Sequence, residues 1–145
     1  MADKTETTWR YDDGGRSEAG YRGLTGDCAV RSAAIVSGRP YQEVYDLVNK
    51  LAQRERPQGR KKRSSAREGV HTVTMRRLMK ELGLEWNPIM GVGTGTTVHL
   101  LASELPKGRL VVRLSRHFAA VIDGVIHDTY DPAREGTRAV YGYWA

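Results

Sequence analysis

The sequence lacks the features that define several large classes of protein. No run of about 18 consecutive apolar residues occurs in the 145-residue chain, so we expect no transmembrane helix and no membrane partner. The opening stretch MADKTETTWRYDDGGR has no apolar core, and we therefore expect no secretory signal. Cys28 is the single cysteine, which excludes an intramolecular disulfide, a zinc knuckle and an iron–sulfur cluster. A lone thiol without an export signal is typical of the reducing cytoplasm.

The net charge of +6 is concentrated in one segment. Residues 54–67 hold seven basic side chains against a single acid, Glu55, whereas the other 16 basic residues are balanced by 16 acidic ones. Because the segment contains one apolar residue, a proline and a glycine, it predicts an exposed, mobile basic loop inserted at residues 54–69. Such a loop attracts polyanions, either nucleic acid or an acidic protein, although it has no aromatic residue for base stacking. The candidate contacts are Arg60, Lys61, Lys62 and Arg63. A solvated insertion is the alternative interpretation.

The remainder of the sequence predicts one domain preceded by a loose arm. Residues 1–19 are polar and include Asp-Asp-Gly-Gly, which favours the arm, and residues 20–145 contain no internal repeat and no second boundary. The glycine-rich run over 91–97 lacks the Lys-Ser/Thr ending of a phosphate loop and the spacing of a dinucleotide-binding fingerprint. It therefore predicts a flexible loop.

Four helices are expected before the last third of the chain. Asp27 predicts the start of the first helix, where its carboxylate would accept a hydrogen bond from a first-turn amide, and Gly38 predicts its end. Apolar residues at helical spacing predict a second helix after Pro40 and a third that is capped by Thr74. A fourth, short helix is expected over residues 98–105.

The last third of the chain changes to the periodicity of strands. Alternating apolar residues predict a strand over 110–115, and an Asp-Gly pair predicts a two-residue turn between strands over 117–122 and 125–130. Residues 138–144 are rich in Tyr, Val and Trp and predict a final strand. Helices that precede an antiparallel sheet define an α+β domain.

Three residues in this arrangement form a set of nucleophile, base and orienting acid. Cys28 opens the first helix, where free amides and the helix dipole stabilise a thiolate, and Arg31 adds a positive charge over the same turn. In the hairpin, strand pairing places Asp128 diagonally across from His117 on one face. A carboxylate at that position can hold the imidazole in the tautomer that a general base needs.

Each of these residues also has a structural interpretation. Cys28 can be a small buried hydrophobe, His117 a histidine bonded to the backbone, and Asp128 one half of a salt bridge. A metal site is a further alternative, because His127 and Asp131 lie on the same hairpin. However, no H-x₃-H or H-E-x-x-H spacing occurs, and the two hairpin histidines have opposite strand parity. We therefore expect no metal and no cofactor.

The motifs GDCAVRSAAI and RHFAAVIDGVIHDT resemble those of the papain-like cysteine peptidase superfamily. They are similar to its small bacterial and phage-encoded members, among them the bacteriocin-processing peptidase domains. These share the Asp-Cys helix start and the His-Phe/Tyr strand that an aspartate follows. The resemblance covers about residues 20–145 and implies a papain-like fold in which helices pack on the sheet. It implies Cys28 as nucleophile, His117 as general base and then acid, and Asp128 as orienting residue.

The sequence departs from the family pattern at the oxyanion site. Papain-like enzymes usually carry a glutamine about six residues before the cysteine, and here that position is Arg22. No Gln or Asn occurs nearby, so we expect the Cys28 amide to act with a second donor, either Thr25 or Arg22. Loss of one such donor costs about 10²–10³ in rate.

Together these features favour a cysteine hydrolase that acts on a peptide, isopeptide or amide bond through a thioester intermediate. Acyltransferase and deamidase activities proceed through the same intermediate. Asp131, which precedes a proline as the family aspartate often does, is the second choice for the orienting acid after Asp128. The alternative is a non-catalytic binding protein on a papain-like scaffold, whose basic loop contacts nucleic acid or an acidic protein.

Overall fold

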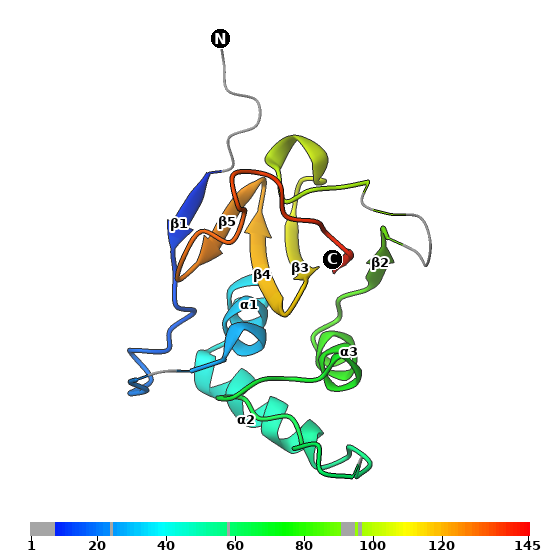
Figure 1. Ribbon diagram of the computed structural model, residues 1–145. Helices are drawn as coiled ribbons and strands as arrows, with labels where there is room; N and C mark the ends of the chain where they lie inside the picture. The colour runs from blue at the N-terminus through cyan, green and yellow to red at the C-terminus, as the bar shows by residue number, and fades with distance from the viewer. Residues whose placement is uncertain (1–7, 24, 58, 91–94, 96) are drawn as a thin grey trace.

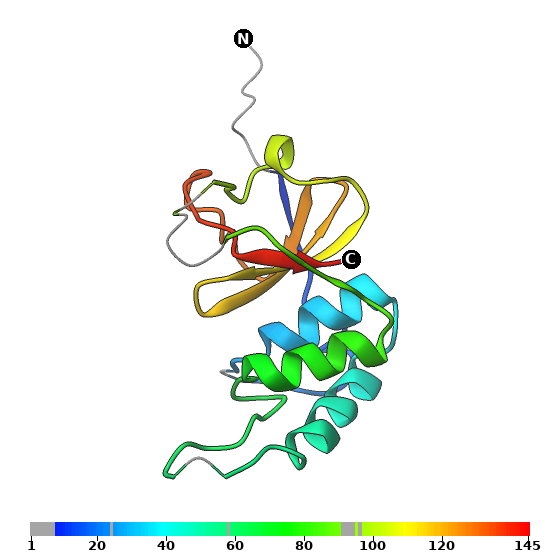
Figure 2. The same cartoon turned by 90° about the vertical axis from the view of Figure 1, so that its right-hand side faces the viewer.

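The computed structural model of the protein describes residues 8–23, 25–57, 59–90, 95 and 97–145. Most of the glycine-rich run at 91–97, predicted to be a loop, lies outside the described residues. The described chain forms three α-helices and one six-stranded sheet, and the helices lie together beneath the sheet in Figure 2. None of the described helices has the length and apolar character that crossing a membrane requires.

The elements follow a simple order along the sheet. The helices are α1 (Cys28–Ser37), α2 (Tyr41–Ala52) and α3 (Thr72–Glu81). The strands, in their order across the sheet, are β1 (Trp9–Tyr11), β5 (Val125–Asp128), β4 (His117–Ile122), β3 (Arg109–Leu114), β6 (Gly142–Trp144) and β2 (Trp86–Pro88). The sheet is antiparallel except at one edge, where β1 runs parallel to β5.

Helix α1 is the central helix and packs directly against β4 (Figure 1). Small residues such as Ala29 and Ala33 are buried on it and allow the close approach. The helix ends as predicted at Gly38, whose φ of 73° lies in the left-handed region that favours glycine, and the Gly38 amide donates to the carbonyl of Ala34 over 2.9 Å. This short-range signal therefore fixes where the helix that begins at Cys28 stops.

The predicted cap of α3 is wrong. The helix begins at Thr72 and is preceded by His71, three residues before the predicted cap, and Thr74 lies within its first turn. Thr74 is buried, and its hydroxyl donates to the Glu55 carboxylate rather than serving as a cap. A buried acceptor from the preceding loop thus competes successfully for this hydroxyl.

The predicted hairpin is confirmed at its turn. Asp123 and Gly124 both have positive φ, 47° and 82°, as a two-residue type I′ turn requires, and Ile122 faces Val125. Strand β5 ends at Asp128, two residues earlier than expected. The parity that places His117 and Asp128 on one face is preserved, because the register starts at this turn.

Two other predicted elements are shorter than expected. The final strand includes Gly142–Trp144, and the residues before it contribute only an isolated bridge between His99 and Ala139. The helix predicted over 98–105 is reduced to a single 3₁₀ turn, η1 (Ala102–Glu104). This segment lies against the side of the sheet away from the helices, where Leu100 and Leu105 are buried.

The prediction of a loose arm over residues 1–19 is wrong for the described part of that segment. Its strand β1 also adds a parallel pair to a sheet that was predicted to be antiparallel. Trp9 lies opposite Ile126, and Tyr11 lies opposite Asp128, so β1 covers the backbone edge of β5. The Asp-Asp-Gly-Gly stretch then forms a turn in which the two aspartate side chains accept hydrogen bonds from the glycine amides. The N-terminal strand thus supports the strand that carries Asp128.

Both faces of the central strands are buried. Val111 and Ala120 face the helices in one core, whereas Val112 and Ala119 belong to a second core on the other face. Trp144 closes the first core, with its ring centroid 4.5 Å from that of Trp86. Burial on both faces holds β4 firmly, and β4 begins with the histidine of interest.

The basic loop is more ordered than its composition suggests, which corrects the prediction of a mobile loop that buries almost nothing. Glu55 is only 9% exposed and accepts a 2.8 Å hydrogen bond from the Ser64 amide. Ala66 is fully buried, and its amide donates to the Asn49 side chain. The central basic residues, 60–63, are all exposed. Their backbone is therefore anchored from both ends.

Candidate active site

Three side chains from three elements meet beside a pocket of about 950 Å³. Cys28 is the first residue of α1, His117 the first of β4, and Asp128 the last of β5. The thiol of Cys28 lies beside the His117 ring and interacts with it electrostatically, and His117 Nε2 lies 2.6 Å from Asp128 Oδ2. Because Asp128 occupies Nε2, the nitrogen left for the sulfur is Nδ1. The structure therefore brings together the three residues that the sequence suggested.

The surroundings of Cys28 favour a thiolate. Burial alone would raise the pKa of the Cys28 thiol. The hydrogen bond and positive charge of His117 outweigh burial, assisted by the backbone N–H of Phe118 and the charge of Arg31, and the pKa falls below its ordinary value. The helix start and the Arg31 charge were predicted from the sequence, whereas the contribution of the Phe118 amide depends on the fold.

The surroundings of His117 favour the imidazolium. Burial alone would lower the pKa of His117, but the hydrogen bonds and negative charges of Asp128 and Cys28 raise it. Burial likewise acts to raise the pKa of Asp128, yet the His117 hydrogen bond, the Thr129 amide and the Arg31 charge lower it overall. The three groups thus stabilise one another in the thiolate, imidazolium and carboxylate forms.

Arg31 connects this triad to a second buried carboxylate. Its guanidinium bonds Asp128 Oδ1 over 3.0 Å and also bonds Asp27, which is fully buried. Asp27 additionally accepts a 2.6 Å hydrogen bond from the Tyr41 hydroxyl and lies 3.2 Å from Arg16 Nη1. Burial and the Asp27 carboxylate raise the pKa of Tyr41, so its hydroxyl stays protonated.

The predicted role of Asp27 as a side-chain cap is therefore wrong. The residue does precede α1, but its carboxylate accepts no amide of the helix. Two guanidinium groups and a phenol bind it instead, and such charge-assisted hydrogen bonds are stronger than a neutral capping bond. Asp27 and Arg31 are one helical turn apart, and this spacing is typical of an ion pair. Nothing in the local sequence pointed to Arg16 or Tyr41.

Of the two expected oxyanion donors, one is already engaged and the other lies outside the pocket lining. Thr25 lines the pocket, but its hydroxyl donates to the carbonyl of Arg67 over 2.9 Å. Arg22 is exposed and lies outside the pocket lining, and its carbonyl accepts a bond from the Arg67 guanidinium. Both residues are hydrogen-bonded to Arg67, near the end of the basic loop. The amide of Cys28, at the start of α1, is the donor that remains from the prediction, because first-turn amides have no intrahelical partner.

The hairpin residues considered as alternatives lie elsewhere. Asp131 is exposed and accepts a 3.0 Å bond from the Ala133 amide. His127 has the opposite parity, as expected, and its Nδ1 lies 3.4 Å from Asp12 Oδ2. Among the residues that the structure describes, no group of three His, Cys, Asp or Glu side chains is arranged to hold a metal ion.

One aromatic contact completes the site. The Tyr130 ring lies 5.3 Å from the His117 ring, centroid to centroid, and Tyr130 is 47% exposed at the pocket edge. The predicted hairpin register places Tyr130 opposite His117. The sequence therefore predicts that they are neighbours, but it does not indicate the role of Tyr130. The Tyr130 ring limits the directions in which the imidazole can rotate.

The chain matches no protein-family model, no curated protein sequence and no solved structure.

Proposed function

We propose that the protein is a papain-like cysteine hydrolase that acts on a peptide, isopeptide or amide bond. The observation that carries the proposal is the position of Cys28 beside His117, which is hydrogen-bonded to Asp128, with the thiol at a helix start and in the lining of an open pocket. The resemblance of the two motifs to the papain-like superfamily agrees with this reaction class. Nucleophile, base and orienting acid in contact are the structural signature of covalent acyl transfer.

The first half of the reaction forms a thioester. The Cys28 thiolate attacks the carbonyl carbon, a C–S bond forms, and the carbonyl electron pair moves to oxygen. The Cys28 amide donates to this oxyanion. When the tetrahedral intermediate collapses, the C–N bond breaks and the His117 imidazolium gives its Nδ1 proton to the leaving nitrogen.

The second half releases the acid. Neutral His117 takes a proton from water as the water oxygen attacks the thioester carbon, and collapse breaks the C–S bond and returns the thiolate. Asp128 stays ionised throughout and holds the ring through Nε2, in the tautomer whose Nδ1 can accept a proton. An amine in place of water would make the same site an acyltransferase.

A non-catalytic binding protein is the second candidate, and one observation favours it. Lys61, Lys62 and Arg63 of the basic loop line the same pocket as Cys28, so an acidic partner could occupy it without reaction. Such a binder has no need for a thiol whose reactivity depends on His117. Thiol reactivity therefore separates the two candidates.

Alkylation of Cys28 with iodoacetamide tests the proposed function. The wild-type protein is expected to react well below the ordinary thiol pKa of about 8.5, because the His117 bond and charge lower the Cys28 pKa. In His117→Ala the thiol loses the hydrogen bond and charge of His117 while burial remains, so the reaction is expected to shift to higher pH. The chain has one cysteine, and labelling measured by mass spectrometry therefore reports this site alone.

The matched control is His127→Ala. This residue lies on the same hairpin but on the opposite face, and its substitution is expected to leave the pH profile of alkylation unchanged. Superimposable profiles for wild type and His117→Ala would show that the two side chains are uncoupled, and would end the proposal.

A further inference from the structure

We propose that the pocket selects acidic polypeptides, whose carboxylate side chains bind the basic residues around it while Cys28 attacks the chain nearby. The inference rests on the proposed function and names its class of substrate. It follows from the position of the basic loop, which is a wall of the same pocket rather than a separate surface.

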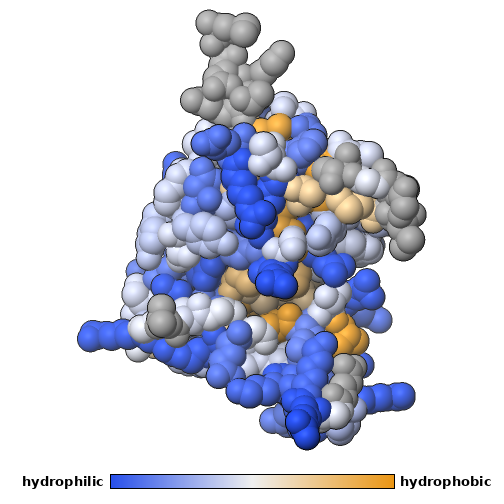
Figure 3. Space-filling model, in the orientation of Figure 1, coloured by the Kyte–Doolittle hydropathy of each residue, from blue (hydrophilic) through white to orange (hydrophobic). Residues whose placement is uncertain are grey.

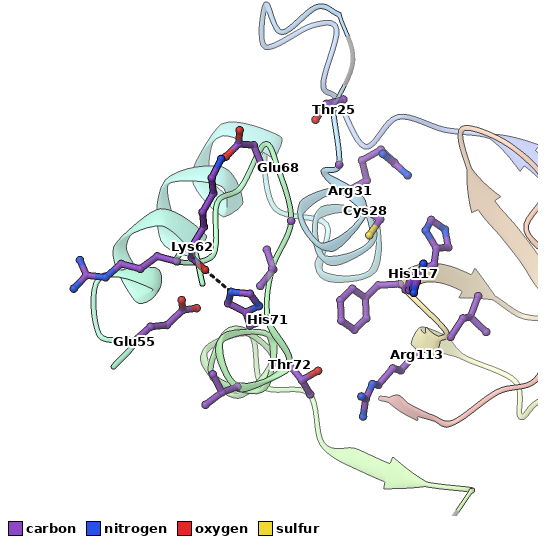
Figure 4. A pocket seen from close by; sticks show the side chains of 18 of the residues that line it. Thr25, Cys28, Arg31, Glu55, Lys62, Glu68, His71, Thr72, Arg113 and His117 are labelled. Atoms are coloured by element: carbon purple, nitrogen blue, oxygen red, sulfur yellow. Dashed lines mark hydrogen bonds between the residues drawn. The ribbon is translucent and has the colours of Figure 1, made fainter. Parts of the chain in front are cut away.

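Basic side chains without a carboxylate partner line the pocket on two opposite walls, and the Arg113 guanidinium among them lies over the Tyr141 ring. One wall is formed by the basic loop and the other by β3 and the turn into β4, and Figure 4 shows Lys62 and Arg113 on these two sides. None of the basic residues on either wall forms an ion pair with a carboxylate in the described part of the chain. They are Arg56, Lys61, Lys62, Arg63, Arg113 and Arg116.

The acids of the pocket do not offset this charge. Two carboxylates line it among the described residues, Glu55 and Glu68. Glu55 is buried and engaged by the Ser64 amide and the Thr74 hydroxyl, whereas Glu68 alone is exposed. The positive surplus is therefore available to a ligand. On the face of the molecule shown in Figure 3, hydrophilic residues gather at the lower end, over the basic loop.

The loop backbone that carries these positive charges is anchored. The His71 ring donates from Nε2 to the carbonyl of Lys62 over 2.7 Å, and the His71 amide donates to the Ser64 hydroxyl over 2.8 Å. These bonds join the basic loop to the start of α3, beside the pocket (Figure 4). The loop therefore presents its cations without a large ordering cost on binding. Low-dielectric walls lined by one sign of charge also concentrate ligands of the opposite sign.

An acidic polypeptide fits this pocket better than a nucleic acid. Cys28 lines the same pocket as these positive charges, and its chemistry requires an acyl carbon, which a phosphodiester does not offer. The basic loop also has no aromatic side chain on which an unpaired base could stack. Carboxylates bind Lys and Arg through charge-assisted hydrogen bonds.

The test uses iodoacetyl peptides of equal length with acidic, neutral or basic side chains, which alkylate Cys28 as iodide leaves. At low ionic strength the acidic peptide is expected to react about tenfold or more faster than the neutral one, and the basic peptide slowest. Added salt is expected to remove the difference, because it screens charges beyond a few ångströms. Small, neutral iodoacetamide serves as the reference in each condition.

Two triple variants with equal charge change localise the effect. Lys61→Gln, Lys62→Gln and Arg63→Gln together are expected to abolish the preference for the acidic peptide and to leave the iodoacetamide rate unchanged. The control combines Arg76→Gln, Arg77→Gln and Lys80→Gln on the exposed side of α3, outside the pocket, and is expected to keep the preference.

The outcomes separate this inference from the proposed function. Equal rates for acidic and neutral peptides, with alkylation by iodoacetamide still dependent on His117, would overturn the substrate class alone. Loss of the His117 dependence would overturn the proposed function instead. A single-stranded oligonucleotide that binds more tightly than the acidic peptide, and is released by the loop variant, would overturn the inference in favour of nucleic acid.

Discussion

Replacing Arg31 with Met is expected to lower the free energy of unfolding by about 3–5 kcal/mol. Arg31 is 6% exposed and bridges Asp27 and Asp128, which are 0% and 2% exposed. Met fills a similar volume but leaves both carboxylates without their shared cation in a buried site. The measurement is the midpoint and slope of denaturation by urea for both proteins.

The control for this prediction is Arg39→Met. Arg39 pairs with Glu43 one helical turn away, but the two side chains are 47% and 50% exposed, so the loss is expected to stay within about 0.5 kcal/mol. Equal, small losses for both variants would show that the Arg31 network is solvated and contributes little.

The Arg31 effect is also expected to depend on pH. The native surroundings lower the pKa of Asp128, so this carboxylate contributes stability above its unfolded pKa of about 3.9 and loses it as the pH falls through the folded value. Part of that contribution comes from Arg31. The difference in stability between wild type and Arg31→Met is therefore expected to narrow in acid, and a difference that widens there would contradict the assignment.

Asp128→Asn is expected to reduce hydrolysis of an acidic peptide by about 10⁴-fold while leaving the fold intact. Oδ1 accepts from both Arg31 and the Thr129 amide, so the asparagine oxygen must take that position. Its NH₂ group then faces His117 and donates to Nε2. The ring proton is forced onto Nδ1, where the imidazole can no longer accept a proton from the thiol or from water.

Asp131→Asn provides the matched control for this substitution. It removes the same charge from the alternative acid, which is exposed and bonded to its own turn, and wild-type rates are expected. The pH profile of Cys28 alkylation gives a second readout, because it is expected to move to higher pH in Asp128→Asn alone. Identical behaviour of the two asparagine variants would remove Asp128 from the mechanism.

The parts of the fold that sequence predicted are those encoded by neighbouring residues. Asp123 and Gly124 set the turn, the turn sets the register, and the register distinguishes Asp128 from Asp131 as the partner of His117. Gly38 in the same way sets the end of α1. Each signal acts over a few residues and needs no knowledge of the rest of the chain.

The parts that sequence missed depend on partners far away in the chain. Strand β1 has three exposed residues and no local pattern, and it exists because the edge of β5 needs a backbone partner. The basic loop is ordered by the buried Glu55, whose hydrogen bonds composition does not reveal. Asp27 resembles a cap until Arg16 and Tyr41 are placed beside it. Charge and composition report what a segment carries, not what it contacts.

The pairing of β1 with β5 also affects when the site comes into being during synthesis. Arg31 and Asp128 are 97 positions apart in the sequence. Strand β1 likewise cannot pair until β5 has been synthesised. Contacts of such separation form slowly and only after the intervening chain has been made. While the nascent chain is still short of β4 and β5, Cys28 has neither its base nor its acid, and its thiol is an ordinary, weakly ionised one. On the proposed mechanism, the protein gains its reactivity only as the sheet closes, so a nascent chain that has not yet reached β5 carries no active nucleophile.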